Sequence, residues 1–324
     1  MFAAAVPLRP GTYHRHVRPP TLPLLPIAFL LLPLLLSATG PVQAKKIYKY
    51  TDADGIVHYT DRAPVDVAEV TAIPVRVDQQ RIAQLRLEGS GRARRAVVLN
   101  SIAGPVEVEV SFAEAVNVGA QPALPLRQVV PAGREMVVAS IESANPALRA
   151  SYRLLMTAVP GDPAAQPEDV EYALPVDAGA RWRIDQGFDG SFSHTDPQSR
   201  YAIDLNVPEG TPVLAARDGT VMQVEDDFDG AGLDREKFGG RANHVRVLHA
   251  DGTMAVYAHL SPESVRVSAG RKVSVGQQLG ASGNTGFSTG PHLHFAVQVN
   301  RGMVLESIPF RLGGSAGAIA IPGG

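Results

Sequence analysis

Apolar and polar residues alternate along much of the chain, as they do in β-strands with one buried and one solvated face. From Val106 to Phe112, apolar residues alternate with Glu107, Glu109 and Ser111. Other short β-prone runs, separated by Pro, Gly and Asn, are residues 135–141, 153–159, 170–174, 201–207, 212–215, 220–224, 244–249, 254–257, 272–275 and 292–299. No stretch after residue 180 has convincing helical periodicity, so we predict a mainly β protein.

These runs divide most of the chain into two domains and a tail. Residues 96–179 predict a β-sandwich-like domain, which holds no cluster of reactive side chains and is expected to act as a spacer or docking unit. Residues 180–312 predict an antiparallel β-domain that contains six of the nine histidines. Residues 313–324 are mostly small, and we expect a flexible tail.

Residues 45–95 predict a small β-hairpin domain followed by a basic connector. Residues 47–50 and 56–59 are β-prone, and Asp-Ala-Asp-Gly between them is typical of a turn. The same D-x-D-G pattern begins some calcium loops, but the acidic residue expected at the end of such a loop is absent. The arginine-rich connector is expected to be solvated, with a short helix around residues 79–87, rather than a surface for an anionic polymer. The hairpin resembles a small domain of unknown function found in exported bacterial proteins.

The first 44 residues predict a signal peptide. Arg9, Arg15 and Arg18 form a positive segment, and the apolar residues 22–36 after it are interrupted by prolines. A membrane anchor needs about 20 continuous apolar residues, which this stretch lacks. We therefore expect cleavage after Ala44, a periplasmic or otherwise secreted mature protein, and no permanent membrane anchor.

Composition excludes several classes of function. Lys plus Arg (30) nearly balances Asp plus Glu (32), so there is no basic surface of the kind that nucleic acid requires. The chain has no Cys, which excludes disulfides, thiolate metal sites and a Cys nucleophile. Any metal site must therefore use histidines and carboxylates.

One pair of histidines has a spacing that suits metal chemistry. His292 and His294 are two apart in a predicted strand, so both project from one face. The H-x-H pattern is weak alone, and His14 and His16 repeat it inside the predicted signal peptide. The pair gains meaning only if further ligands lie upstream.

Further ligand candidates do lie upstream. Asp204 stands in a strand between the apolar Ile203 and Leu205, where a carboxylate needs a partner such as a metal. His194 precedes it, and His259 ends another strand. Two imidazoles and one carboxylate on zinc leave a fourth position open to water, whose pKa zinc lowers to about 7. The H-E-x-x-H helix is absent, so the leftover imidazoles, His259 and His292, are the available general acid–base groups.

Three separated motifs resemble the lysostaphin/LytM-type zinc endopeptidases. They are YAIDLNVPEGTPVLAARDGTV, NHVRVLHADGTMAVYAHL and GNTGFSTGPHLHF, which occur in the order of that family. The resemblance spans nearly all of residues 186–298. It implies the family's antiparallel β fold, the duplicated hybrid motif, with a groove over one zinc ion. It also implies that the substrate is the stem peptide of peptidoglycan.

Carried over residue by residue, the resemblance assigns the whole candidate site. It implies His194, Asp204 and His294 as zinc ligands and His259 and His292 as catalytic residues. One departure is the spacing, because the family's usual H-x-x-x-D is replaced by ten residues between His194 and Asp204. A subgroup with the Y-A-x-D form is similar, so His194 is kept as a ligand.

Two other groups of residues have alternative interpretations. Residues 225–240 form an acidic loop that is longer than usual in the family. Its Asp227, Asp229 and Asp234 could bind calcium, although a solvated loop that shapes the groove wall is favoured. His244 and His249 are five apart and so face opposite sides of a strand; we expect a groove-edge or surface residue and a turn residue.

The resulting hypothesis is a secreted zinc-dependent endopeptidase that hydrolyses peptide crosslinks of peptidoglycan through a zinc-activated water. The alternative is a catalytically silent or autoinhibited cell-wall-binding regulator that activates an amidase or contacts other division proteins. All five site positions are filled, which favours the enzyme. A zinc-storing protein without substrate is a weaker alternative, because it would not need His259 and His292. The bond cleaved, a Gly-Gly bridge or a D-Ala–diaminopimelate crosslink, is open, although a periplasmic setting favours the second.

Overall fold

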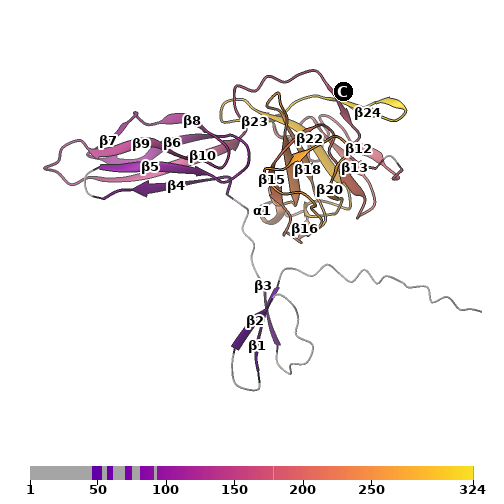
Figure 1. Ribbon diagram of the computed structural model, residues 1–324, viewed down its shortest axis with the longest axis horizontal. Coiled ribbons are helices and arrows are strands. Elements are labelled where there is room, and N and C mark those ends of the chain that lie inside the picture. Colours follow the sequence, from indigo (N-terminus) through magenta and orange to yellow (C-terminus); the bar gives the residue numbers. More distant parts are fainter. Residues whose placement is uncertain are drawn as a thin grey trace, which may run out of the picture. The chain divides into compact units, whose positions relative to one another are not determined.

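The computed structural model describes residues 46–52, 57–60, 70–74, 81–90, 93–177 and 179–323 (Figure 1). The predicted signal peptide, its cleavage site and most of the D-x-D-G turn lie outside these residues. Strands dominate the described part of the chain, which contains one four-residue helix, so the mainly β prediction is confirmed. None of the described helical residues forms a span long and apolar enough to cross a membrane.

The N-terminal segment forms a small antiparallel sheet. β1 (Lys46–Thr51) pairs with β2 (Val57–Thr60), and Tyr50 lies opposite His58 with the two rings stacked 5.0 Å apart. The predicted hairpin is therefore confirmed. A third strand, β3 (Val70–Pro74), pairs with the other edge of β1 and was not predicted, because its partner lies twenty residues earlier in the chain.

The middle region consists of two antiparallel sheets that share one core, as expected for a β-sandwich-like domain. Val98, Val106, Val108 and Ile141 are fully buried between them. The first sheet has the order β4 (Ala83–Glu88), β5 (Ala93–Asn100), β9 (Glu135–Ser143) and β7 (Val118–Gln121), and the second has β10 (Ser151–Pro160), β6 (Val106–Val116) and β8 (Leu126–Val130).

The prediction of a short helix around residues 79–87 is wrong. Residues 83–88 are strand β4, which pairs with β5 along its whole length. The sequence there alternates Ala83, Leu85 and Leu87 with polar residues, a period of two that the hydrogen bonds to β5 select. The middle sheet therefore begins before residue 96, inside the segment that the sequence assigned to a connector.

The C-terminal region is built on an eight-stranded antiparallel sheet, with β18 and β22 near its centre (Figure 1). Along its strands, Ile203, Val245, Tyr257 and Phe295 point into a common core and are fully buried. The residues between them therefore point to the opposite face. The strands, in spatial order, are β12 (Arg183–Gln186), β13 (Ala202–Asn206), β22 (Leu293–Asn300), β18 (Met254–Ala258), β17 (His244–Leu248), β15 (Gly219–Glu225) and β19 (Lys272–Val273), and β23 (Leu305–Ser307) also pairs with β22.

Smaller two-stranded sheets close this domain. β14 (Pro212–Leu214) pairs with β20 (Gln278–Ala281), which brings Val213 and Leu279 into the same core. β16 (Ala231–Gly232) pairs with β21 (Gly286–Phe287) and so attaches the acidic loop to the glycine-rich loop before β22. The first pair therefore extends the core, and the second fixes the acidic loop beside the glycine-rich loop.

The prediction of a flexible tail at residues 313–324 is wrong for the part of this segment that the structure describes. β24 (Arg311–Gly314) and β25 (Gly317–Ile319) form a hairpin, and the Phe188 amide donates to the carbonyl of Pro322 at 2.9 Å. β24 also pairs in parallel with β11 (Glu171–Ala173). Small residues suit this hairpin because a Cβ on Gly313 would lie 2.2 Å from the Glu171 carboxylate.

The C-terminal core includes residues that precede the boundary predicted at residue 180. Tyr172 and Val176 are 3% and 1% exposed and pack in that core. Two methionines of the C-terminal sheet, Met222 and Met254, are fully buried in the middle region's core instead. A fragment that starts at residue 180 would therefore lose core side chains and expose both methionines.

His249 is a buried histidine that serves this core. Its side chain packs edge-on against the ring of Tyr172 at 5.6 Å, and its Nδ1 donates to the carbonyl of Asp218 at 2.7 Å. Its Nε2 is buried without a partner. Burial lowers the pKa of His249 to about 4, because a proton on Nε2 would place an unsolvated charge in the core.

We predict that His249 makes stability depend on pH. An unfolded histidine binds a proton below pH 6.5, whereas His249 in the folded protein does so only near pH 4, so unfolding takes up a proton and stability falls as pH drops between these values. His249→Asn keeps a donor toward Asp218 and removes the titration. Urea unfolding at pH 7.5 and pH 5 should show a smaller pH effect in the variant, by about 1–2 kcal/mol. Equal pH effects in the two proteins would contradict this.

Candidate metal centre

Two strands of the sheet place a carboxylate beside an imidazole. Asp204 on β13 lies directly opposite His294 on β22, and its Oδ1 is 2.9 Å from Nδ1 of His294. Ile203 and Leu205 point into the core, so Asp204 points to the other face. The side chains of Asp204 and His294 are only 14% and 16% exposed.

His194 reaches the same carboxylate from a loop. Its Nε2 lies 3.2 Å from Asp204 Oδ1, and its side chain is fully buried. Its Nδ1 donates to the carbonyl of Gly187 at 2.7 Å, where a side chain would be excluded because a Cβ on Gly187 would lie 2.1 Å from the Pro322 oxygen. The ten-residue spacing is thus compatible with one site: one ligand atom from each of His194, Asp204 and His294 lies within 4.8 Å of the others.

The protonation of His194 shows that this cluster fits a cation. Because its Nδ1 must carry the hydrogen that Gly187 accepts, Nε2 of the neutral ring is an acceptor. That acceptor faces the Asp204 oxygen, which is also an acceptor, so a proton or a metal ion must lie between them. Two imidazole nitrogens and one carboxylate oxygen form a donor set that suits zinc and other borderline divalent metals.

Asp204 is held ionised by its surroundings. Burial alone would raise its pKa, but hydrogen bonds with His194 and His294 hold the pKa far below its usual value. The second oxygen, Oδ2, accepts a hydrogen bond of 3.0 Å from Nε2 of Gln186, which lies opposite Asp204 on β12. No local pattern singles out Gln186, because this glutamine gains its role only from the pairing of β12 with β13.

The two remaining predicted histidines lie beside the cluster. His292 Nε2 is 3.8 Å from Asp204 Oδ1, and the rings of His259 and His292 are 4.5 Å apart. His259 Nδ1 donates to the Thr285 carbonyl at 2.6 Å, and His292 Nδ1 donates to the Gly290 carbonyl at 2.8 Å. Both rings therefore keep Nε2 free of hydrogen when neutral.

Burial keeps these two rings neutral. It lowers the pKa of His259 to about 3, with a further contribution from its imidazole neighbours, and it also lowers the pKa of His292. His259 has a backbone φ of 63°, a left-handed conformation that is uncommon for residues other than glycine. Such a conformation directly after β18 turns the chain toward the Thr285 carbonyl that orients the ring.

The five predicted site residues adjoin a groove with a volume of about 630 Å³, which Asp204, His259, His292 and His294 line directly. One wall carries Phe192, which is 54% exposed and stacks on Phe287 at 6.1 Å. Arg235 lies 4.4 Å above the ring of Phe287. The groove thus combines a polar floor with an aromatic wall.

The acidic loop contributes the wall beside Phe287. Its short helix α1 (Arg235–Phe238) begins at Asp234, whose carboxylate accepts hydrogen bonds from the amides of Glu236 and Lys237. Arg235 and Phe238 line the groove. Among the described residues, the only group with metal-ligand geometry is the cluster at Asp204, so the calcium alternative for this loop gains no support.

The other two histidines take the places expected of them. His244 lines the groove, and burial lowers its pKa to about 4. His249 follows β17 in a turn where its carbonyl accepts a hydrogen bond from the Gly252 amide, as predicted, although it is more deeply buried than a turn residue usually is. Neither histidine contributes to the cluster.

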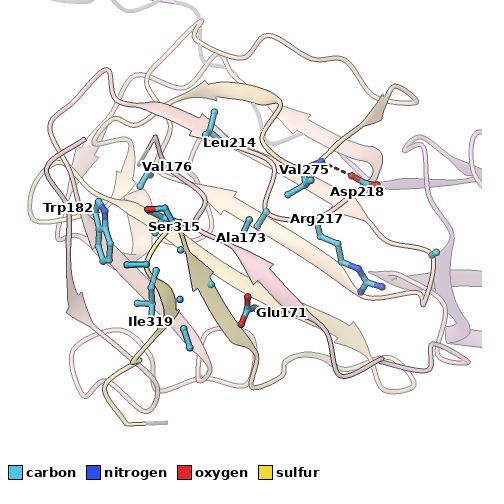
Figure 2. Close-up of a pocket in the computed structure, with 18 residues that line it drawn as sticks. Glu171, Ala173, Val176, Trp182, Leu214, Arg217, Asp218, Val275, Ser315 and Ile319 are labelled. Atoms are coloured by element: carbon cyan, nitrogen blue, oxygen red, sulfur yellow. Dashed lines mark hydrogen bonds between the residues drawn. The ribbon is translucent and has the colours of Figure 1, made fainter. Parts of the chain in front are cut away.

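A second cavity, of about 1010 Å³, lies elsewhere on the C-terminal region (Figure 2). Its lining includes Trp182, Val176 and Leu214 together with residues of the β24–β25 hairpin such as Ile319. Asp218 accepts a hydrogen bond of 2.6 Å from the Val275 amide at its rim (Figure 2). It shares no lining residue with the groove, and none of the five predicted site residues lines it.

Two regions of the chain match known protein families. Residues 198–305 match Peptidase family M23, and residues 34–84 match DUF4124, a domain of unknown function. The predicted resemblance to lysostaphin/LytM-type peptidases is therefore confirmed for the C-terminal domain, as is the small N-terminal domain. His194 lies just before the matched M23 range, so its place in the cluster depends on the geometry described above.

Curated relatives match this domain over part of their length. An uncharacterized metalloprotease of Haemophilus influenzae is 38% identical over 114 residues, which are 35% of this chain and 21% of the relative. The peptidoglycan DD-endopeptidase ShyA of Vibrio cholerae is 37% identical over 128 residues, 39% of this chain and 26% of the relative. This chain therefore spans about a quarter or less of the lengths of these two relatives.

Solved structures show similarity over part of the chain. The catalytic domain of the M23 protein EnpA from Enterococcus faecalis is 27% identical, with 43% of this chain and 94% of that chain covered and a TM-score of 0.32. The catalytic domain of lysostaphin from Staphylococcus simulans is 29% identical, with 37% and 81% covered and a TM-score of 0.28.

We predict that the cluster at Asp204 binds one divalent metal ion. His294→Ala and Asp204→Asn should each weaken zinc binding by more than about 100-fold, because each removes a ligand. His259→Asn should keep the metal, because Nε2 of His259 is not part of the cluster. Competition with a chelator, followed by elemental analysis, measures the affinity, and His249→Asn is the matched control. Retention of one zinc ion by both ligand variants would contradict the assignment.

Proposed function

We propose that the chain is a zinc-dependent endopeptidase that hydrolyses peptide crosslinks of peptidoglycan. The observation that carries this proposal is the geometry at Asp204. His194, Asp204 and His294 converge on one point, while two further imidazoles, His259 and His292, present unprotonated Nε2 atoms beside it. A purely structural zinc site would have four protein ligands and no need of neighbouring bases.

In this proposal His194, Asp204 and His294 hold zinc, which when bound polarises a peptide carbonyl and lowers the pKa of water. His259 and His292 move the protons. Each ring is fixed by its Nδ1 hydrogen bond to a carbonyl, so Nε2 is the atom that accepts a proton from water and later delivers it to the leaving amine. Gln186 holds the Asp204 carboxylate in place through its second oxygen.

The substrate class rests on the relatives. ShyA is named a peptidoglycan DD-endopeptidase, and Mpg of Neisseria meningitidis, 41% identical over 98 residues, is named a DD-carboxypeptidase/endopeptidase. ALE-1 of Staphylococcus capitis, 38% identical over 103 residues, is named a glycyl-glycine endopeptidase. The word endopeptidase is common to these three names, while the bond that each name describes differs. We propose the crosslink that ends in D-Ala, in keeping with an exported protein whose signal peptide is cleaved after Ala44.

The alternative is a regulator that binds cell-wall peptide without cleaving it, or an enzyme that its own N-terminal domains inhibit. DipM of Caulobacter vibrioides, 38% identical over 101 residues, is named a cell division protein. The complete set of five site residues favours the enzyme. No described residue before Asp185 lines the groove, so the described part of the N-terminal domains gives no support to autoinhibition.

The test is digestion of purified sacculi with the protein, followed by mass spectrometry of the soluble fragments. The proposal expects crosslinked dimers to decrease and monomers of the cleaved stem peptide to accumulate. His294→Ala should abolish this activity, and so should a chelator, whereas His249→Asn should retain it. An unchanged sacculus with zinc bound to the protein would contradict the enzyme and favour the regulator.

A further inference from the structure

Arg246 is a buried cation without a counter-ion in the described part of the chain. It lies on β17 with 8% of its surface exposed. Its one hydrogen bond runs from Nη1 to Oε1 of Gln298 at 2.6 Å, and its Nε has no acceptor. Arginine is seldom buried without a carboxylate, since an unpaired charge in the protein interior is strongly unfavourable. Arg246 therefore needs an explanation.

The sheet register places Arg246 on the same face as the metal cluster. Arg246 lies opposite Val256, which lies opposite Ala296, and His294 is the next residue of β22 on that face. Arg246 and His294 lie two strands apart across the sheet and two residues apart along the strand direction. Their Cα atoms are therefore separated by roughly 12 Å. Both residues line the one groove. An extended peptide advances about 3.3–3.6 Å per residue, so this Cα separation corresponds to between about three and four substrate residues.

The acidic residues of the groove are already engaged. Asp185 pairs with Arg183 and accepts a hydrogen bond from Asn206, while Asp196 accepts from the hydroxyl and amide of Ser199. The third acid, Asp204, accepts from the imidazoles and from Gln186. None of the three forms an ion pair with Arg246. On β18, the residue directly opposite Arg246 is the apolar Val256, which also lines the groove.

This environment favours an anionic ligand. Burial lowers the pKa of Arg246 to about 10, so it remains charged at neutral pH. Gln298 orients the guanidinium and in turn donates to the carbonyl of Gln198 at 2.8 Å, which ties it to the loop that carries His194. A guanidinium fixed in this way offers the remaining N–H groups of its two Nη atoms to a planar carboxylate, the anion that arginine binds with two parallel hydrogen bonds, while Nε is buried.

We propose that Arg246 binds a carboxylate of the substrate, within about four residues of the amide to be cleaved. The inference rests on the proposed peptidase function and narrows its substrate class to anionic crosslinked peptides. A bridge made only of glycine has no such carboxylate beside the scissile amide. A crosslink to a diamino acid with a free carboxylate has one. Arg246 is thus assigned as a residue that determines specificity.

The test uses two synthetic crosslinked stem-peptide dimers that differ only near the crosslink, where the carboxylates are free in one and amidated in the other. Wild-type protein should hydrolyse the free-acid dimer with a kcat/KM about 10- to 100-fold higher, mostly through KM. Arg246→Met, which keeps the volume, should lose this preference and leave the rate on the amidated dimer within about two-fold. Arg246→Lys should recover part of the preference, since lysine keeps the charge and loses the planar fork.

Arg235→Met is the matched control, because Arg235 lines the same groove but stacks on Phe287 at its wall. An equal loss of preference in that variant would assign the effect to the general charge of the groove and overturn the inference. A purely structural role for Arg246 would instead lower the rates on both dimers together or release zinc, and either result would also overturn it. Equal hydrolysis of both dimers by the wild-type protein would also overturn the inference about Arg246. It would leave the proposed peptidase function intact.

Binding of the carboxylate-bearing cleavage fragment, free or amidated, separates this inference from the proposed function. Titration calorimetry should show tighter binding of the free-acid fragment, by about 10-fold or more, and Arg246→Met should remove the difference. If neither dimer is hydrolysed but this difference is found, the peptidase proposal fails and the carboxylate site stands. Equal binding of the two fragments would contradict the site.

Discussion

The Asp204 carboxylate and the imidazoles around it form the interaction on which the candidate site depends. Oδ1 of Asp204 is approached by His294 at 2.9 Å and by His194 at 3.2 Å, from a neighbouring strand and from a loop. The first contact follows from the pairing of β13 with β22, in which the two residues lie opposite each other. A shift of β13 by one residue would turn Asp204 into the core and away from His294, so the strand register and the chemistry of this site depend on each other.

The same kind of hydrogen bond orients every histidine of the C-terminal domain apart from His294. His194, His244, His249, His259 and His292 each donate Nδ1 to a backbone carbonyl. The consequence is that Nε2 is the unprotonated atom of each neutral ring. Where Nε2 faces the core, as in His249, the histidine only affects stability. Where it faces the groove, as in His259 and His292, the same tautomer is suited to proton transfer.

The local pattern of the sequence predicted the centre of the C-terminal domain well. Alternation alone indicated that His292 and His294 share a face and that Asp204 points away from Ile203 and Leu205. His194 was different, because its spacing from Asp204 has no periodicity, and only the resemblance to a known family singled it out. The roles of Gln186 and Arg246 depend on which strands become neighbours, and that information is not local to either residue. For the same reason the sequence missed β4, the β24–β25 hairpin and the inclusion of β11 in the C-terminal core.

The central claim is that one metal ion lies between His194, Asp204 and His294. A crystal of the zinc-loaded protein, measured on both sides of the zinc absorption edge, locates that ion directly. If these three residues bind zinc, we expect a single strong anomalous peak within about 2.0–2.2 Å of Nε2 of His194, a carboxylate oxygen of Asp204 and a nitrogen of His294. A peak on the aspartates of the acidic loop, or between His259 and His292 without Asp204, would contradict it.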